Sequence, residues 1–197
     1  MRHRHTTPFE MVEFKFHCKM PIFVARQWVR HRTANINEYS LRYSEARDEF
    51  YLPDPEHIQF QSSLNKQGRL GEVSDSLKAK VSDYFQEISN RSFEIYSELN
   101  DAGVARELAR AVLPVNLYTE WYWKNDLHNL LHFVGLRSDS HAQYEIRVFS
   151  DAMAESVKKV APFAWEAYQD YVISGLRFSR IEQSLLEQNL PERVIDD

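Results

Sequence analysis

Residues 30–42 read RHRTANINEYSLR, and this polar stretch carries the strongest signal in the chain. It opens with the basic run at 30–32 and continues with Glu38, Ser40 and Arg42 at alternate positions. If the backbone is extended, these three side chains point to one side. Arginine, a hydroxyl and backbone amides together suit phosphate, because the planar guanidinium meets two phosphate oxygens at once. The stretch therefore favours a phosphate site over a solvated basic helix end.

Length, charge and cysteine content limit the possible functions. The chain has 197 residues, which suffices for one domain with its own core. Its net charge of −5 argues against general nucleic-acid binding, so the basic stretch indicates a small anionic ligand. The sequence has no run of about eighteen apolar residues and no apolar leader, so it predicts neither a membrane span nor a signal peptide. Cys18 is the single cysteine, and we expect a cytoplasmic protein without membrane partners.

Residue periodicity predicts a mixture of strands and helices. Residues 11–20 alternate apolar and polar side chains, as in a half-buried strand, whereas apolar residues from Leu77 to Leu99 recur with a helical period. Pro162 should kink the last long helix. The expected elements are a turn capped by Thr7, a strand at 11–20, a helix at 22–32, a loop at 33–42, a short strand at 50–52, helices at 74–100 and 104–113, a strand at 115–124, and helices at 126–136 and 142–172. This mixture predicts an α+β domain.

Other residues with reactive side chains give weaker signals. Cys18 lies on the apolar phase of its strand, so a buried hydrophobic role is favoured over a nucleophile. His3 and His5 have the spacing of a zinc pair, but no companion ligands follow, and we predict no metal. His128 and His132 stand one helical turn apart. They either contact a heteroaromatic ligand or form an ordinary polar helix face.

The spacing of residues 30–42 resembles the RHRx7SxR motif of the flavin-dependent thymidylate synthases. The blocks HRHTTPFEMVEFKFHCKMPIFVARQW, ARAVLPVNLYTEWYWKNDLHNLLHF and LRSDSHAQYEIR resemble further parts of that family. The likeness runs from residue 3 to about residue 172. It implies one domain over residues 1–197, with a twisted, mostly antiparallel sheet, long flanking helices and a C-terminal tail at 174–197.

The resemblance also implies a reaction and a site. The family makes thymidylate from deoxyuridylate (dUMP), with 5,10-methylenetetrahydrofolate supplying the carbon and FAD, reduced by NADPH, supplying a hydride. Its members are homotetramers with shared active sites. The implied dUMP contacts are Gln27, Arg30, Glu38, Tyr39, Ser40, Leu41, Arg42, Arg110 and Arg137. The implied FAD contacts are His5, Thr7, Glu10, Arg30, His31, Arg32, Asp126, His128, His132, Leu136 and His141.

Two of these residues receive particular roles. Arg137 is the implied catalytic residue, since it would stabilise charge that develops on the uracil. Ser40 is expected to bind rather than attack, because no base for it is evident and the flavin carries the difficult chemistry.

Two departures from the family pattern leave alternatives open. Met11 stands where the family often has histidine, and the family normally carries a few dozen residues before the block that here starts at residue 3. We therefore expect a truncated or pared-down first segment, which could weaken flavin binding and assembly. One alternative is a relative that binds nucleotide or flavin without turnover. Another is a nucleic-acid-binding module that uses residues 30–42, against which the net charge argues.

Overall fold

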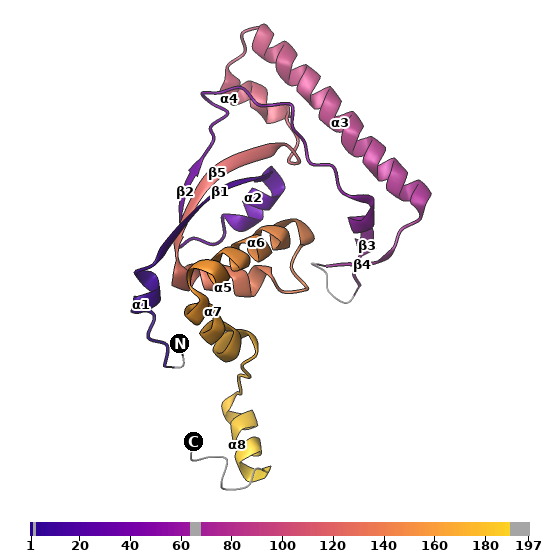
Figure 1. Cartoon of the computed structure of the whole chain (residues 1–197). Helices are drawn as coiled ribbons and strands as arrows, with labels where there is room; N and C mark the ends of the chain where they lie inside the picture. Colours follow the sequence, from indigo (N-terminus) through magenta and orange to yellow (C-terminus); the bar gives the residue numbers. More distant parts are fainter. Residues whose placement is uncertain (2, 64–67, 190–197) are drawn as a thin grey trace. The chain divides into compact units, whose positions relative to one another are not determined.

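The chain contains both helices and antiparallel strands, which confirms the predicted α+β class (Figure 1). The computed structural model describes residues 1, 3–63 and 68–189. Contacts divide the chain into two units, one spanning Thr6–Ser156 and the other formed by Met1–His5 and Val157–Asp197. That residues 1–197 form a single domain stays a prediction.

A three-stranded antiparallel sheet lies at the centre of the Thr6–Ser156 unit. Its strand order is β1 (Glu13–Pro21), β5 (Tyr118–Asp126) and β2 (Asn35–Glu38). Polar and apolar residues alternate along β1 and β5, so one face is buried and the other exposed. The predicted strands at 11–20 and 115–124 are confirmed, with bounds shifted by one to three residues.

β2 corrects the prediction of a loop over residues 33–42. Asparagines favour turns locally, but Asn35 pairs with Lys124 and Glu38 with Trp121 along β5. The ladder satisfies the backbone hydrogen bonds of this polar segment, and this pairing outweighs the local preference. Part of the motif at 30–42 therefore forms an edge strand of the sheet.

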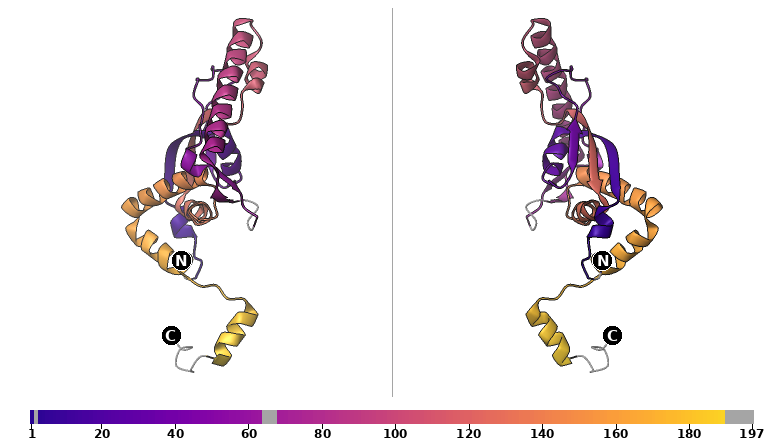
Figure 2. Two further views of the ribbon diagram at one scale, coloured as in Figure 1. Left: turned by 90° about the vertical axis from the view of Figure 1, so that its right-hand side faces the viewer. Right: turned by 90° about the vertical axis from the view of Figure 1, so that its left-hand side faces the viewer.

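Two helices cover the buried face of this sheet, and Figure 2 shows α2 against one side of the strands. α2 (Ile22–Trp28) and α5 (Leu127–Arg137) both pack on β1 and β5. The fully buried ring of Trp28 lies 5.4 Å from Trp123 and 4.9 Å from Phe133 between centroids. Truncating such a residue costs about 3–5 kcal/mol. α2 is shorter than the predicted helix at 22–32, so the basic run at 30–32 lies beyond its end.

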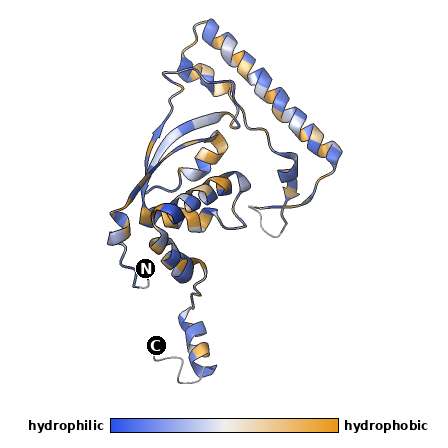
Figure 3. Ribbon diagram, viewed as in Figure 1, coloured by the Kyte–Doolittle hydropathy of each residue, from blue (hydrophilic) through white to orange (hydrophobic). Residues whose placement is uncertain are grey.

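α3 (Asp75–Asp101) is the longest helix and confirms the prediction at 74–100. Ser74 caps it, because its Oγ accepts from the Leu77 N–H at 3.4 Å. Gly103 follows its end with φ of +77°, a conformation that favours glycine. Figure 3 shows apolar and polar residues interspersed along its length. Tyr96 is buried on α3, and its hydroxyl accepts from the Ala46 N–H at 2.8 Å.

The structure departs in part from several local predictions between residues 43 and 113. Residues 50–52 form no strand of their own, and only Phe50 makes an isolated bridge, to Leu117. The polar segment after them contains elements that its sequence did not indicate. These are η1 (Pro55–His57), β3 (Gln59–Gln61) and β4 (Arg69–Glu72). The predicted helix at 104–113 is α4 (Arg106–Ala109) followed by the 3-10 turn η2 (Arg110–Val112).

The ends of the chain also differ from expectation. The first helix, α1 (Thr7–Glu10), has Thr6 rather than Thr7 at its N-cap. Pro162 separates two helices rather than kinking one, because Ala161 before it has φ −132° and ψ 61°. The segment 142–172 accordingly contains α6 (Tyr144–Val160), α7 (Pro162–Tyr168) and the π-helix η3 (Gln169–Ile173), and α8 (Arg180–Asn189) lies in the expected tail. None of the described helices has the length and apolar character that crossing a membrane requires.

Cys18 lies on the buried face of β1, as predicted. Its side chain is 6% exposed. Burial raises the pKa of its thiol to about 11, because the thiolate loses hydration there. This environment disfavours the nucleophilic form.

Candidate functional site

A cavity of about 510 Å³ opens where β2 ends, and we call it the Ser40 cavity. It is lined by Ile22, Glu38, Tyr39, Ser40, Leu41, Glu107, Arg110, Ala111, Leu113, Leu117 and Thr119. Five of the predicted dUMP contacts are in this set. The sheet edge, a following turn and η2 bring them together from segments about 70 residues apart in sequence.

The turn that follows β2 shapes one wall of this cavity. The Tyr39 N–H still bonds to the Glu120 carbonyl oxygen at 2.8 Å, as in the sheet. The Ser44 N–H bonds to the Ser40 carbonyl oxygen at 3.1 Å, and the Arg42 N–H donates to Ser40 Oγ at 3.3 Å. The chain therefore stops following β5 at Ser40 and turns beside the cavity.

Two carboxylates at the Ser40 cavity already have partners. Thr119 Oγ1 donates to Glu38 Oε1 at 2.7 Å, and Thr119 is only 7% exposed. Glu107 forms an ion pair with Arg42 at 3.4 Å, and its carbonyl oxygen accepts from Arg110 Nε at 3.4 Å. The Arg42–Glu107 pair is more than half exposed, and such pairs are weak. An incoming anion can therefore replace Glu107 on Arg42.

Arg137 and His31, predicted separately as a dUMP contact and an FAD contact, lie together outside the lining of the Ser40 cavity. Arg137 Nε donates to His31 Nε2 at 3.0 Å. The His132 ring lies 6.4 Å from the His31 ring, and the Phe133 ring lies edge-on to it at 4.9 Å. Burial, then the charge of Arg137 and then His132 lower the pKa of His31 to about 4. Burial also lowers the pKa of Arg137. His31 is thus neutral at physiological pH.

α5 carries a row of predicted flavin residues on its exposed side. His128, His132 and Leu136 follow one another at four-residue spacing, and all three are exposed. Asp126 caps this helix, since its carboxylate accepts from Asn129 N at 2.8 Å and from Asn129 Nδ2 at 2.7 Å. The exposed row leaves both imidazoles accessible to a ligand.

Three predicted residues on or beside α2 have side-chain polar groups that no described residue pairs with. Gln27 Oε1 is shielded from solvent and lacks a hydrogen-bond partner within the described part of the chain. An unsatisfied buried acceptor is costly, so this atom is suited to a ligand donor. Arg30 and Arg32 are exposed and form no ion pair with any described residue. Their two positive charges, on either side of His31 in the sequence, are therefore available to an anionic ligand.

The remaining predicted residues lie elsewhere. Thr7 and Glu10 are on α1, which packs against α5. His141 Nδ1 lies 2.8 Å from Asp139 Oδ1, and hydrogen bonds from the His141 backbone and side chain lower the pKa of Asp139. His5 belongs to the other contact unit. The roles given to these residues stay predictions.

Sequence reasoning missed a buried polar cluster around Glu145, which is only 4% exposed. Glu145 accepts from Arg69 Nη2 with both oxygens at 2.7 Å, from Tyr51 OH at 2.8 Å and from Gln143 Nε2 at 2.9 Å. Burial alone would raise the pKa of Glu145, but these donors outweigh it and the pKa is lowered. Burial and the Glu145 hydrogen bond raise the pKa of Tyr51. No periodic pattern in the sequence pointed to this cluster, because Tyr51 and Arg69 lie in a polar segment without one.

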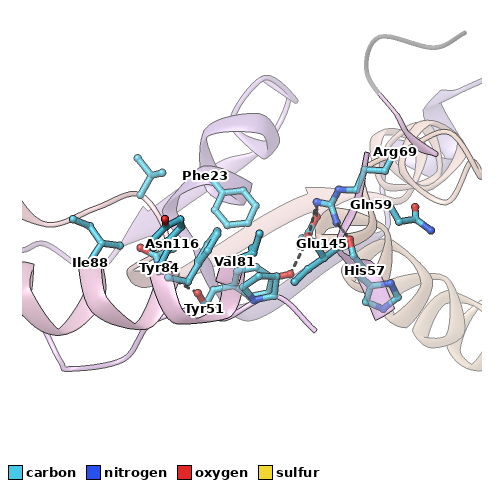
Figure 4. A pocket seen from close by; sticks show the side chains of 14 residues that line it. Phe23, Tyr51, His57, Gln59, Arg69, Val81, Tyr84, Ile88, Asn116 and Glu145 are labelled. Atoms are coloured by element: carbon cyan, nitrogen blue, oxygen red, sulfur yellow. Dashed lines mark hydrogen bonds and ion pairs between the residues drawn. The ribbon is translucent and has the colours of Figure 1, made fainter. Parts of the chain in front are cut away.

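The Glu145 cluster closes one end of a larger cavity of about 660 Å³ (Figure 4). In Figure 4, Arg69 and Tyr51 reach Glu145 at this end, while Tyr84 and Ile88 of α3 line the opposite end. The described lining includes none of the predicted site residues.

Two residues that line the Ser40 cavity were also missed. Thr119 is buried on β5, and its inward phase in that strand was the available signal. Glu107 precedes Arg110 by three residues, which is a helical neighbour position. No group of three or more His, Cys, Asp or Glu residues in the described ranges is arranged to hold a metal ion.

Comparison with known proteins places this geometry in a family. The family model described as thymidylate synthase complementing protein matches residues 1–163. The chain is 53% identical over 188 residues to the flavin-dependent thymidylate synthase of Ehrlichia ruminantium (strain Gardel), covering 95% of this chain and 63% of that protein. It is 50% identical over 214 residues to the same-named protein of Rickettsia typhi, covering 100% of this chain and 72% of the relative.

A solved structure has the same fold. The UMP/dUMP methylase PolB from Streptomyces cacaoi, bound with 5-Br UMP, matches with a TM-score of 0.82 at 35% identity. The match covers 87% of this chain and 80% of PolB. The chain spans less than two thirds of the Ehrlichia relative's length. Family model, relatives and fold agree, and the chain belongs to the thymidylate synthase complementing protein family.

Proposed function

We propose that this chain is a flavin-dependent thymidylate synthase, which converts dUMP to thymidylate with 5,10-methylenetetrahydrofolate as the carbon donor. The observation that carries the proposal is the Ser40 cavity, because it gathers five predicted dUMP contacts from distant segments. The names of the Ehrlichia and Rickettsia relatives support the same activity.

The Ser40 cavity offers groups for a nucleotide monophosphate. Arg110 provides a guanidinium and Ser40 a hydroxyl at the turn, and Arg42, outside the lining, is paired with Glu107 of the lining. The phosphate would take the place of Glu107 beside Arg42. Tyr39 and Leu41 line the same wall. This arrangement would let the basic motif bind the phosphate of a nucleotide.

Glu38 suits the sugar of the same nucleotide. Its Oε1 is held by Thr119, which leaves Oε2 to accept from a sugar hydroxyl. A carboxylate fixed in this way costs less conformational entropy when it binds. Gln27 contributes an acceptor that the described residues leave unsatisfied.

Arg137 would act on the uracil, and because it lies outside the Ser40 cavity lining of its own chain, it would reach a dUMP held by another copy of the chain. Its Nε is occupied by His31, and its terminal nitrogens make no hydrogen bond to described residues. A half-buried guanidinium stabilises developing negative charge more strongly than one in water. This electrostatic role makes Arg137 the proposed catalytic residue, together with its contact to dUMP.

The flavin-side residues fit an FAD cofactor. Arg30 and Arg32 leave two charges open for a pyrophosphate, and His128, His132 and Leu136 present polar and apolar surface along α5. His5, Thr7, Glu10, His31, Asp126 and His141 complete the proposed set. When bound, FAD would supply the hydride after reduction by NADPH. The protein residues bind, orient and polarise the ligands.

We further propose a homotetramer with shared sites, acting in the cytoplasm on small molecules rather than on nucleic acid. Tyr84 and Ile88 on α3 are 55% and 54% exposed, which supports coverage by another copy. The net charge of −5 favours small anionic ligands at a local basic site over a long polyanion. Residues 1–197 would act as one domain in each subunit.

The test is product formation by the purified protein loaded with FAD. Methylenetetrahydrofolate, NADPH and either dUMP or UMP are supplied, and methylated nucleotide is measured by chromatography. Thymidylate formation from dUMP supports the proposal, whereas preferential use of UMP would support the second activity named for PolB. A protein that binds dUMP and FAD but forms no product would refute turnover and leave a binding role.

A further inference from the structure

We infer that His31 is a positioning residue, whose unprotonated Nε2 holds the Arg137 guanidinium and directs its terminal nitrogens toward the ligand. The role at the uracil rests on the proposed function, but the pairing itself does not. The geometry that carries the inference is the 3.0 Å hydrogen bond between Arg137 Nε and His31 Nε2.

The direction of this bond determines the histidine tautomer. Arginine has only N–H donors, so His31 Nε2 must act as the acceptor. A neutral imidazole then carries its proton on Nδ1. His31 can consequently donate to a cofactor through Nδ1, but it has no second acceptor to offer. An imidazolium would lose the bond and would oppose a second cation.

The environment keeps His31 neutral. Arg137 and His132 face it from α5, and the cationic Arg30 and Arg32 flank it in sequence. No described carboxylate forms an ion pair with His31. Burial and these neighbours all disfavour a positive charge on the ring.

The core fixes the position of this acceptor. The His31 N–H bonds to the Trp28 carbonyl oxygen at 2.9 Å, and the Phe133 ring contacts the imidazole edge-on. Trp28 and Phe133 are fully buried. Contacts with the buried core therefore hold the imidazole in place just beyond the end of α2. Because the guanidinium is planar, holding its Nε also sets the direction in which both terminal nitrogens point.

The first experiment needs no ligand. Nitrogen NMR of labelled histidines in the full chain reports tautomer and titration for each ring. His31 should show the Nδ1–H tautomer and titrate well below the ordinary histidine pKa of about 6.5. In Arg137→Gln, its pKa should rise, because one cationic neighbour is gone. An Nε2–H tautomer, or ordinary titration in the wild type, would overturn the inference.

The second experiment measures dUMP affinity by calorimetry in the FAD-loaded protein. His31→Phe fills the ring space without an acceptor and should weaken binding about tenfold or more. His31→Gln retains a carbonyl acceptor and should stay within roughly threefold of wild type. His17→Phe, on the exposed sheet face, is the matched control and should bind normally.

A double variant tests whether His31 acts through Arg137. In the Arg137→Gln background, His31→Phe should weaken dUMP binding no further, since the group it positions is already absent. If the two substitutions instead weaken dUMP binding by independent factors that multiply, the positioning role is wrong. If the wild type binds no dUMP, the proposed function fails, while the ligand-free NMR result still decides the pairing.

Discussion

Thr119 on β5 donates its hydroxyl to Glu38 at the end of β2, with 2.7 Å between the two oxygens. The bond joins neighbouring strands at the rim of the Ser40 cavity, and Thr119 itself is almost fully buried. A carboxylate at a sheet edge is thereby held in one orientation rather than left to rotate in solvent. This is the contact that makes Glu38 a defined acceptor.

Replacing Thr119 by valine should therefore weaken dUMP binding while the fold is retained. Valine has nearly the same shape but lacks the hydroxyl, so Glu38 loses its orienting donor. We expect roughly a five- to tenfold increase in the dUMP dissociation constant, measured by calorimetry. Thr119→Ser keeps the hydroxyl and should bind nearly as wild type. Equal affinities for the valine variant and the wild type would show that the bond does not orient Glu38.

Sequence and structure agree best where one segment decides its own conformation. The helical period from Leu77 to Leu99 and the capping Ser74 were sufficient to predict α3. β2 required knowledge of a partner, since Asn35 and Asn37 read as turn residues until they pair with β5. The fold depends on such distant pairings, which local propensity does not encode.

The candidate site shows the same division. The motif spacing indicated Ser40 and Arg42, but not Thr119 and Glu107, which come from segments about 70 residues later in sequence. The Glu145 cluster was invisible for a similar reason. Its partners Tyr51 and Arg69 lie in a polar region without a periodic pattern.

Removing Arg69 should strongly destabilise the protein. Glu145 is buried and ionised, and Arg69 supplies two of its hydrogen bonds. Arg69→Met would leave that charge without its cation, which costs about 3–5 kcal/mol of unfolding free energy. Urea unfolding at neutral pH measures this difference. Arg91→Met, which removes an exposed helix-surface pair, is the control and should have little effect.

The same cluster predicts a pH dependence of stability. The pKa of Glu145 is lower in the folded state than the ordinary value of about 4.3. Its ionised form therefore stabilises the fold above that pH, and the contribution is lost as pH falls through the folded pKa. The stability gap between wild type and Glu145→Gln should be largest near neutral pH and shrink in acid. A gap that stays constant from neutral to acid pH would contradict an ionised Glu145.

Cys18 should be inert toward thiol reagents in the folded protein. Its thiol is buried, and its pKa of about 11 leaves almost no thiolate at neutral pH. Labelling by a disulfide reagent should be negligible until urea unfolds the chain. Cys18→Ala should retain turnover and lose roughly 1 kcal/mol of stability through the small cavity it leaves. Rapid labelling of the native protein, or loss of turnover in this variant, would reopen a catalytic role.

Ser40→Ala should weaken nucleotide binding but leave turnover at saturating dUMP. The Ser40 oxygen accepts from the Arg42 N–H at 3.3 Å, and no described base hydrogen-bonds to it. A hydroxyl without a base is a poor nucleophile, so its loss should raise KM several-fold with kcat within about threefold. Arg137→Ala provides the contrast, because loss of a group that stabilises the transition state lowers kcat itself, by about a hundredfold or more. Circular dichroism checks that both variants fold. If Ser40→Ala binds dUMP normally yet turns over nothing, the hydroxyl takes part in the chemistry and the binding role is wrong.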